Sequence, residues 1–250
     1  MNRSLVFLLL LNLPMATAKE ATTATPPVEL PQAKPRIAIV IDDLGHHADN
    51  HAFVALKYPL TLAIMPFSRK AEELAAAATK AGHEIMIHMP MQPESLPEQA
   101  QEVLDIQDTK AQFIATLSAA FSRLPQASGL NNHQGSLMTA EEAQMSWLMH
   151  ELKQRQMYFL DSRTSVATVA EATARKLGVP SNRRHVFLDN DPSPAAIAQQ
   201  WQQVEYIAKS QGYAVVIGHP YVTTLTFLQQ LNDQHVDNFE FVYFSELLEE

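Results

Sequence analysis

Carboxylates and imidazoles recur in this sequence directly after short apolar runs. The residues that follow these runs are Asp42 and Asp43, His88, Asn132 and His133, Asp161 and Ser162, Asp189 and Asn190, and His219. In parallel β/α architectures, the loops that leave the carboxyl ends of the strands converge on one face, where active sites form. Two adjacent carboxylates and three histidines at such a rim could hold a divalent metal with an open position and supply an acid and a base.

Each of these residues also has a structural interpretation when it is taken alone. Asp42 and Asp43 could serve as turn or helix-cap residues before Leu44 and Gly45. A single buried histidine is more often a structural residue than a metal ligand. The joint placement of the polar residues after so many strands favours a functional site over core packing.

Two histidines flank the same short strand, with His83 at its start and His88 at its end. At about 3.3 Å per residue their Cα atoms lie roughly 16 Å apart, so the two side chains cannot bind one metal. His88 is at the carboxyl end and is therefore the ligand candidate, whereas His83 is expected to be structural. His46, just past Asp43, is a weaker candidate for lining the cleft.

The apolar patterning predicts strands that alternate with helices. We expect strands at residues 37–41, 61–65, 84–87, 129–131, 158–160, 186–188, 214–217 and 239–244, and helices at 71–81, 110–123, 140–156, 166–177 and 195–211. This order predicts a single α/β domain, a (β/α) barrel that is irregular or distorted and has seven or eight strands. A doubly wound open sheet is the alternative. Residues 91–109 interrupt the alternation and could form either a wall of the substrate cleft or a solvated crossover loop.

The amino-terminal residues are typical of an export signal. Residues 1–18 contain Arg3, an apolar run at 5–13 and an Ala-Thr-Ala cleavage site. Because the run is shorter than the roughly 20 residues that a spanning helix needs, we expect cleavage, no stable membrane span and a periplasmic location. Residues 19–35 contain four prolines and are expected to be a flexible linker before a domain at 36–250.

Composition narrows the possible functions. A net charge of −9 and a pI near 5.5 argue against nucleic-acid binding. The chain has neither a P-loop nor a G-x-G-x-x-G motif for nucleotides, and it lacks the G-x-S-x-G elbow of serine hydrolases. It contains no cysteine, so any metal must be bound by His, Asp or Glu.

Taken together, the polar motifs resemble the polysaccharide deacetylases with the NodB homology domain, and specifically their divergent branch. The matching pieces are Ile41-Asp42-Asp43-Leu44-Gly45, His88-Met89-Pro90-Met91, Asn131-Asn132-His133-Gln134-Gly135-Ser136, Phe159-Leu160-Asp161-Ser162 and Gly218-His219-Pro220. They follow the family's order from Arg36 to the carboxyl terminus. The resemblance implies a hydrolase that removes acyl (acetyl) groups from cell-envelope polysaccharide or a peptidoglycan-type glycan.

The resemblance also implies a metal site. Asp43 and His88 match ligands of the main family, whose second motif has another histidine four residues after the first. That position is Gln92 here, and His133 is the implied replacement ligand. Zinc is the expected ion for these nitrogen and oxygen ligands, with manganese, cobalt and nickel as alternatives.

The same resemblance assigns the acid and base of metal-assisted amide or ester hydrolysis. Asp42 would accept a proton from the attacking water, and His219 would protonate the departing amine or alkoxide. Asp161 would orient His219 or contact substrate.

Two other functions fit the same residues. A catalytically inert protein that binds glycans or assists envelope assembly could keep the barrel and the cleft. A barrel glycosidase could instead use paired carboxylates from Asp42, Asp161 and Asp189.

Overall fold

The structure, a computed structural model, describes residues 33–47, 50–95, 102–234 and 238–248. The expected export signal and residues 19–32 of the expected linker lie outside the described residues. Residues 34–250 form one compact unit. Its elements in chain order are β1 (Arg36–Leu44), α1 (His51–Val54), β2 (Thr61–Ile64), α2 (Ala71–Ala81), β3 (Glu84–Met91), α3 (Lys110–Arg123), β4 (Gly129–Gln134), η2 (Met138–Ala140), α4 (Glu142–Gln154), β5 (Tyr158–Asp161), α5 (Ala170–Leu177), β6 (Ser181–Arg183), β7 (Val186–Phe187), α6 (Pro194–Gln211), β8 (Tyr213–Gly218), α7 (Val222–Gln234), β9 (Glu240–Val242) and η3 (Ser245–Leu247).

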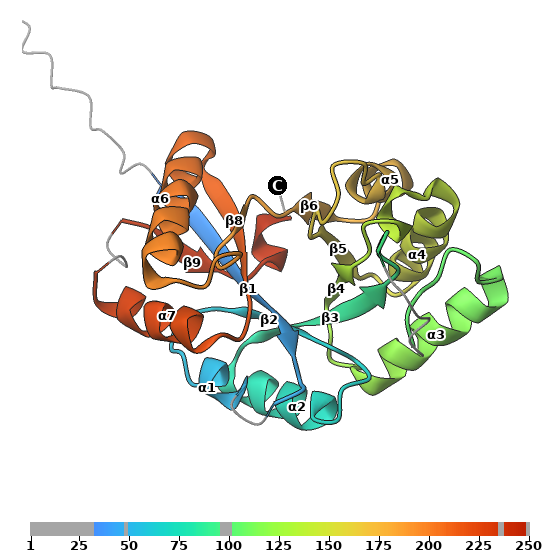
Figure 1. Ribbon diagram of the computed structural model, residues 1–250, viewed down its shortest axis with the longest axis horizontal. Helices are drawn as coiled ribbons and strands as arrows, with labels where there is room; N and C mark the ends of the chain where they lie inside the picture. Colours follow the sequence, from blue (N-terminus) through green and yellow to red (C-terminus); the bar gives the residue numbers. More distant parts are fainter. Residues whose placement is uncertain (1–32, 48–49, 96–101, 235–237, 249–250) are drawn as a thin grey trace, which may run out of the picture. The chain divides into compact units, whose positions relative to one another are not determined.

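The strands pair in parallel in one curled sheet, with the helices around its outer side (Figure 1). The strand order is β6-β5-β4-β3-β2-β1-β8-β7, and β9 pairs with the first residues of β1. The two ends of this order are consecutive in the chain, because only Arg184 and His185 separate β6 from β7. Their backbone N–H groups donate to the carbonyl oxygens of Asp161 on β5 and Val215 on β8. One interrupted strand thus links both edges, which makes the sheet an irregular (β/α) barrel, as predicted.

Apolar side chains fill both faces of the sheet. In β1, Ile37, Ile39 and Ile41 belong to the larger core cluster, which also contains residues of all seven α-helices in the described part of the chain. Ala38 and Val40 belong to a second cluster inside the curl of the sheet. Successive residues of a strand point to opposite faces, so this alternation identifies which face of each strand lines the interior.

The helices α2 and α3 have the bounds expected from the sequence, whereas β6, α1 and α7 were not expected. The strand β6 is Ser-Asn-Arg and has no apolar run from which a strand could be predicted. Backbone groups pair it with β5, and this pairing does not require apolar side chains. Among the residues described, no helix is both long and apolar enough to span a bilayer.

The irregular segment after β3 returns to the end of that strand. Leu104 pairs in parallel with Met91, and its N–H group donates to the carbonyl oxygen of Pro90. The side-chain oxygen of Gln92 accepts a hydrogen bond of 2.9 Å from the N–H group of Ile106. These bonds hold Leu104 and Ile106 beside the carboxyl end of β3.

Gly129 permits β4 and β5 to pack closely, and we expect Gly129→Ala to destabilise the fold. A Cβ atom at this position would lie 2.0 Å from the ring of Tyr158. Such an overlap costs about 1–3 kcal/mol of unfolding free energy, measurable by urea denaturation. Ser128→Ala, at the exposed neighbouring residue, is the control and should change stability by less than about 0.5 kcal/mol. Equal stability of the two variants would contradict the prediction.

Candidate active site

At the carboxyl end of several strands, the next side chain on the inner face is polar. The residues reached in this way are Asp42 on β1, His88 on β3, Asn131 and His133 on β4, and His219 just past β8. Strand alternation alone therefore directs these side chains toward the interior at the carboxyl end of the sheet.

Asp43 reaches the same site by a different route. In a regular strand it would point away from its neighbour Asp42. Between Ile41 and Leu44, however, the register of β1 against β2 shifts, and Asp43 has a φ of +57°. Aspartate tolerates this left-handed conformation better than most residues. The resulting bulge brings the Asp43 carboxylate to the two histidines of the site.

Three ligand atoms meet at this point. The Oδ1 atom of Asp43 lies 3.0 Å from Nε2 of His88 and 2.8 Å from Nδ1 of His133. The two histidine nitrogens are 3.1 Å apart. The structure thus brings together the three residues that the family resemblance implies as metal ligands.

The protonation of His88 follows from its neighbour Asn131. The amide nitrogen of Asn131 donates to Oδ1 of Asp42 at 2.8 Å, so the amide oxygen faces His88. Nδ1 of His88 donates a hydrogen bond of 2.8 Å to that oxygen. In the neutral ring, Nε2 therefore presents a lone pair toward the Asp43 carboxylate, whereas in the protonated ring Nε2 donates a hydrogen bond to it.

Lone pairs that converge in this way repel one another unless a cation or a proton lies between them. Two histidines and one carboxylate are a ligand set of catalytic zinc sites, and a ligand histidine ordinarily donates its second N–H group to an oxygen acceptor. The residues present therefore fit a divalent metal.

The charges in this cluster shift the pKa values of its members. Burial alone would raise the pKa of Asp43, but hydrogen bonds from His133 and His88 and the charges of both rings hold it well below its usual range. Burial raises the pKa of Asp42, and this effect exceeds the opposing charges of His88 and His219 and the hydrogen bond from Asn131. Asp42 is only 2% exposed, so it is a carboxylate with increased proton affinity.

His219 is held by Asp189, whose side chain is fully buried. Nδ1 of His219 donates to Oδ1 of Asp189 at 2.7 Å, and its backbone N–H group donates to Oδ2 at 2.6 Å. The hydroxyl of Thr224 donates to the same Oδ2. Burial would lower the pKa of His219, but the hydrogen bond and charge of Asp189 raise it to about 9. His219 is thus a protonated imidazole near neutral pH, with Nδ1 engaged by Asp189.

Asp161 lies elsewhere than expected. On β5 it has the same orientation as Phe159, which packs in the cluster with the helices. Its carboxylate accepts hydrogen bonds from the Thr168 hydroxyl and from the backbone of the first turn of α5. The carboxylate that orients His219 is therefore Asp189, and Asp161 stabilises the start of α5.

Other expected residues take distinct positions. Nε2 of His83 lies 3.0 Å from the carbonyl oxygen of Val54, away from the cluster. Gln92 stands where the main family has its second histidine. Its side-chain oxygen accepts the hydrogen bond from the N–H group of Ile106. A cleft of about 500 Å³ adjoins the cluster and is lined by Asp43, His46, His47, Met65, His133, His219, Pro220 and Tyr221.

Arg184 is a residue near the site that the sequence did not single out. Its Nε and Nη2 atoms donate to the carbonyl oxygens of Ser162 and Arg163, and its guanidinium lies 3.6 Å over the ring of Phe187. That ring is in turn 5.8 Å from the ring of His219. Burial and the charge of Arg163 lower the pKa of Arg184 to about 10. The only sequence signal was a basic residue shortly before the strand expected at 186–188.

We expect Asp189→Asn to lower the pKa of His219 by at least about one unit, because the substitution removes the negative charge that favours the imidazolium. NMR titration of the imidazole resonances would measure it. The exposed Asp191→Asn is the control and should leave this pKa near 9. A wild-type value retained in Asp189→Asn would contradict the assignment.

Because folding raises the pKa of His219, its contribution to stability is complete below about pH 6.5 and is lost as the pH rises through about 9.

Solved structures share this fold. An uncharacterized protein from Agrobacterium tumefaciens C58 superposes with a TM-score of 0.82 at 22% identity, covering 86% of this chain and 89% of that one. The catalytic domain of a peptidoglycan N-acetylglucosamine deacetylase from Eubacterium rectale superposes with a TM-score of 0.52 at 14% identity, covering 86% and 90%. The curled sheet and its helices are therefore the fold that is also found in such deacetylases.

Sequence comparison identifies the family. An uncharacterized protein from Haemophilus influenzae is 36% identical over 198 residues, which cover 79% of this chain and 71% of that protein. The family described as divergent polysaccharide deacetylase matches residues 39–248, a range that contains every residue of the site described above. The chain therefore belongs to the divergent polysaccharide deacetylase family.

Proposed function

We propose that this protein is a metal-dependent hydrolase that removes acyl groups from a cell-envelope polysaccharide or peptidoglycan-type glycan. The observation that carries the proposal is the convergence of Asp43, His88 and His133 on one point. Asp42, whose pKa is raised, and His219, whose raised pKa keeps it protonated, act electrostatically on each other beside this point.

Asp43, His88 and His133 would hold the metal, with zinc as the first expectation. When bound, a divalent ion polarises the acyl carbonyl and makes a nearby water more acidic. The hydrogen bond from His88 to Asn131 keeps the ring oriented for that role, and Asn131 couples it to Asp42.

The protein's own groups move the protons. Asp42 accepts a proton from the water whose oxygen forms the new bond to the acyl carbon. His219 donates its proton to the departing nitrogen or oxygen as the bond to the acyl carbon breaks. The products are a carboxylic acid and a free amine or hydroxyl group on the glycan.

The cleft suits a carbohydrate leaving group. It lies beside His219 and contains the polar side chains of His46 and His47. Tyr221, which is 47% exposed, offers an aromatic face of the kind that sugars stack on. With the export signal expected at residues 1–18, we place this reaction in the periplasm.

Two alternatives differ in what they require. A glycosidase would need carboxylates that face the cleft, but Asp161 binds the start of α5 and Asp189 is buried against His219. A catalytically inert glycan-binding protein is favoured by one observation, namely that Gln92 replaces the family's second histidine and binds Ile106. The two experiments below separate this alternative from the hydrolase.

The purified protein should bind about one zinc ion per chain, and His88→Ala and His133→Ala should each weaken binding by at least about tenfold because each removes a ligand. Calorimetry with zinc chloride measures the affinity. His150→Ala removes an exposed histidine that is distant from the site in the fold and is the matched control. Equal zinc affinity in all four proteins would refute the proposed metal site.

The zinc-loaded protein should release acetate from N-acetylglucosamine oligomers, detected by mass spectrometry. Asp42→Asn and His219→Ala should each reduce kcat by about 10²- to 10⁴-fold, the usual contribution of an acid or base. The exposed Asp191→Asn makes the same charge change as Asp42→Asn and should retain activity. Zinc binding without turnover, together with glycan binding that Asp42→Asn leaves unaffected, would support the inert protein instead.

A further inference from the structure

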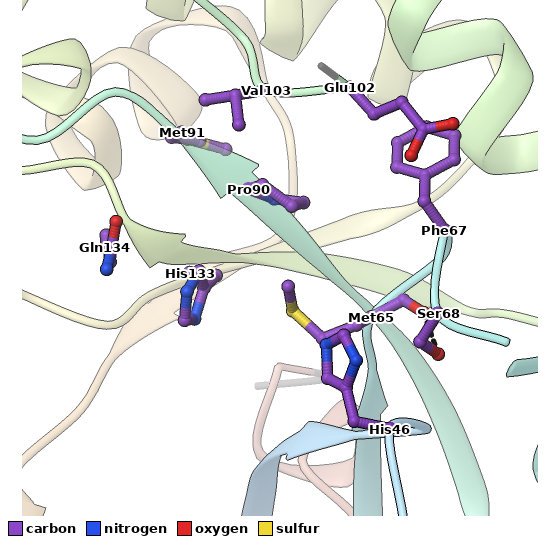
Figure 2. Close-up of a pocket in the computed structure, with 10 residues that line it drawn as sticks. All are labelled: His46, Met65, Phe67, Ser68, Pro90, Met91, Glu102, Val103, His133 and Gln134. Carbon is purple, nitrogen blue, oxygen red and sulfur yellow. Dashed lines mark hydrogen bonds between the residues drawn. The ribbon is translucent and has the colours of Figure 1, made fainter. Parts of the chain in front are cut away.

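A second cavity adjoins His133 of the metal-ligand cluster. It has a volume of about 280 Å³ and is lined by five apolar and five polar side chains, the polar ones being His46, Ser68, Glu102, His133 and Gln134 (Figure 2). Met65, Phe67, Pro90, Met91 and Val103 form its apolar wall, and we call the cavity the apolar pocket after this wall. A water molecule occupies about 30 Å³ in the liquid, so this space far exceeds what an acetyl methyl group fills.

The pocket is a built part of the fold. Met65 directly follows β2, and Pro90 and Met91 end β3. Val103 precedes Leu104, which is hydrogen-bonded to the end of β3. Thioether side chains such as Met65 and Met91 adapt to apolar groups of varied shape.

The pocket and the proposed acid lie on opposite sides of β1. Strands β2, β3 and β4 carry the pocket, whereas His219 follows β8, and β1 with Asp43 stands between β2 and β8. The polar cleft that contains His219 shares only Met65, His46 and His133 with the pocket. A substrate that binds across the metal ligands therefore has one end in each space.

Protonation assigns the two ends. The leaving nitrogen or oxygen must lie within reach of His219, so the glycan occupies the polar cleft. The carbon chain of the acyl group extends from the carbonyl in the other direction, toward the apolar pocket. We infer that the apolar pocket binds the acyl chain and that this enzyme prefers glycans with linear acyl groups of about four to eight carbons over acetylated glycans.

This inference rests on the proposed function and is tested with glucosamine oligomers that carry N-acetyl, N-butanoyl, N-hexanoyl or N-octanoyl groups. Release of the free amine gives kcat/KM for the zinc-loaded protein. Burial of each further methylene should increase kcat/KM about fourfold until the pocket is full. Hydrolysis of the acetyl compound without any gain for longer chains would overturn the inference and leave the proposed function intact.

The variant Val103→Trp fills the pocket and should reduce the hexanoyl-to-acetyl ratio of kcat/KM by at least about tenfold. Val166→Trp is the matched control, because Val166 is 95% exposed and lines none of these cavities, and it should keep the wild-type ratio. Phe67→Ala, which enlarges the pocket, should move the optimum to longer chains. An unchanged ratio in both pocket variants would overturn the inference.

Two further measurements separate an acyl-chain pocket from a leaving-group pocket and from failure of the proposed function. A gain with acetyl esters of longer alcohols, in place of longer acyl groups, would assign the pocket to the leaving group and overturn the inference. If no acyl compound is hydrolysed, the proposed function fails and calorimetry with linear carboxylates decides. Octanoate bound more tightly than acetate by wild-type protein but not by Val103→Trp would still support an acyl-chain pocket, and equal affinities would refute it.

Discussion

The buried contact between Asp42, Asn131 and His88 constrains the rest of the site. A carboxylate and an imidazole in the interior of a sheet lose the solvation of water, and this loss is tolerated only when their polar atoms find partners. The amide of Asn131 satisfies one atom of each group at once. It thereby leaves Nε2 of His88 with its lone pair directed outward, toward Asp43 and His133.

The barrel makes this contact possible by placing β1, β3 and β4 at suitable separations. The strands β3 and β4 pair side by side, whereas β2 lies between β1 and β3. The curl of the sheet brings β1 back toward β4 across the interior, where Asp42 meets Asn131. A flat sheet with the same strand order would hold these two residues roughly 15 Å apart, at about 4.8 Å per strand.

The ends of the strands also divide the surroundings by polarity. On the side of β8, Asp189 and Thr224 hold His219 beside a cleft with several histidines. On the side of β2 and β3, Met65 and Met91 line an apolar cavity. The proposed metal ligands occupy the boundary, so the two parts of the proposed substrate would meet different environments.

The sequence by itself determined the alternation of strands and helices and the polar residues at the strand ends, because these depend on short-range periodicity and on the direction of parallel strands. It favoured a barrel over a doubly wound open sheet. Tertiary structure alone decided three matters. The bulge at Asp43 depends on the register between β1 and β2. The partner of His219 is Asp189 and not Asp161, since Asp161 lies on the helix-facing side of β5. The pairing of β6 could not be predicted from Ser-Asn-Arg, because backbone hydrogen bonds to the distant segment β5 do not require any side-chain pattern.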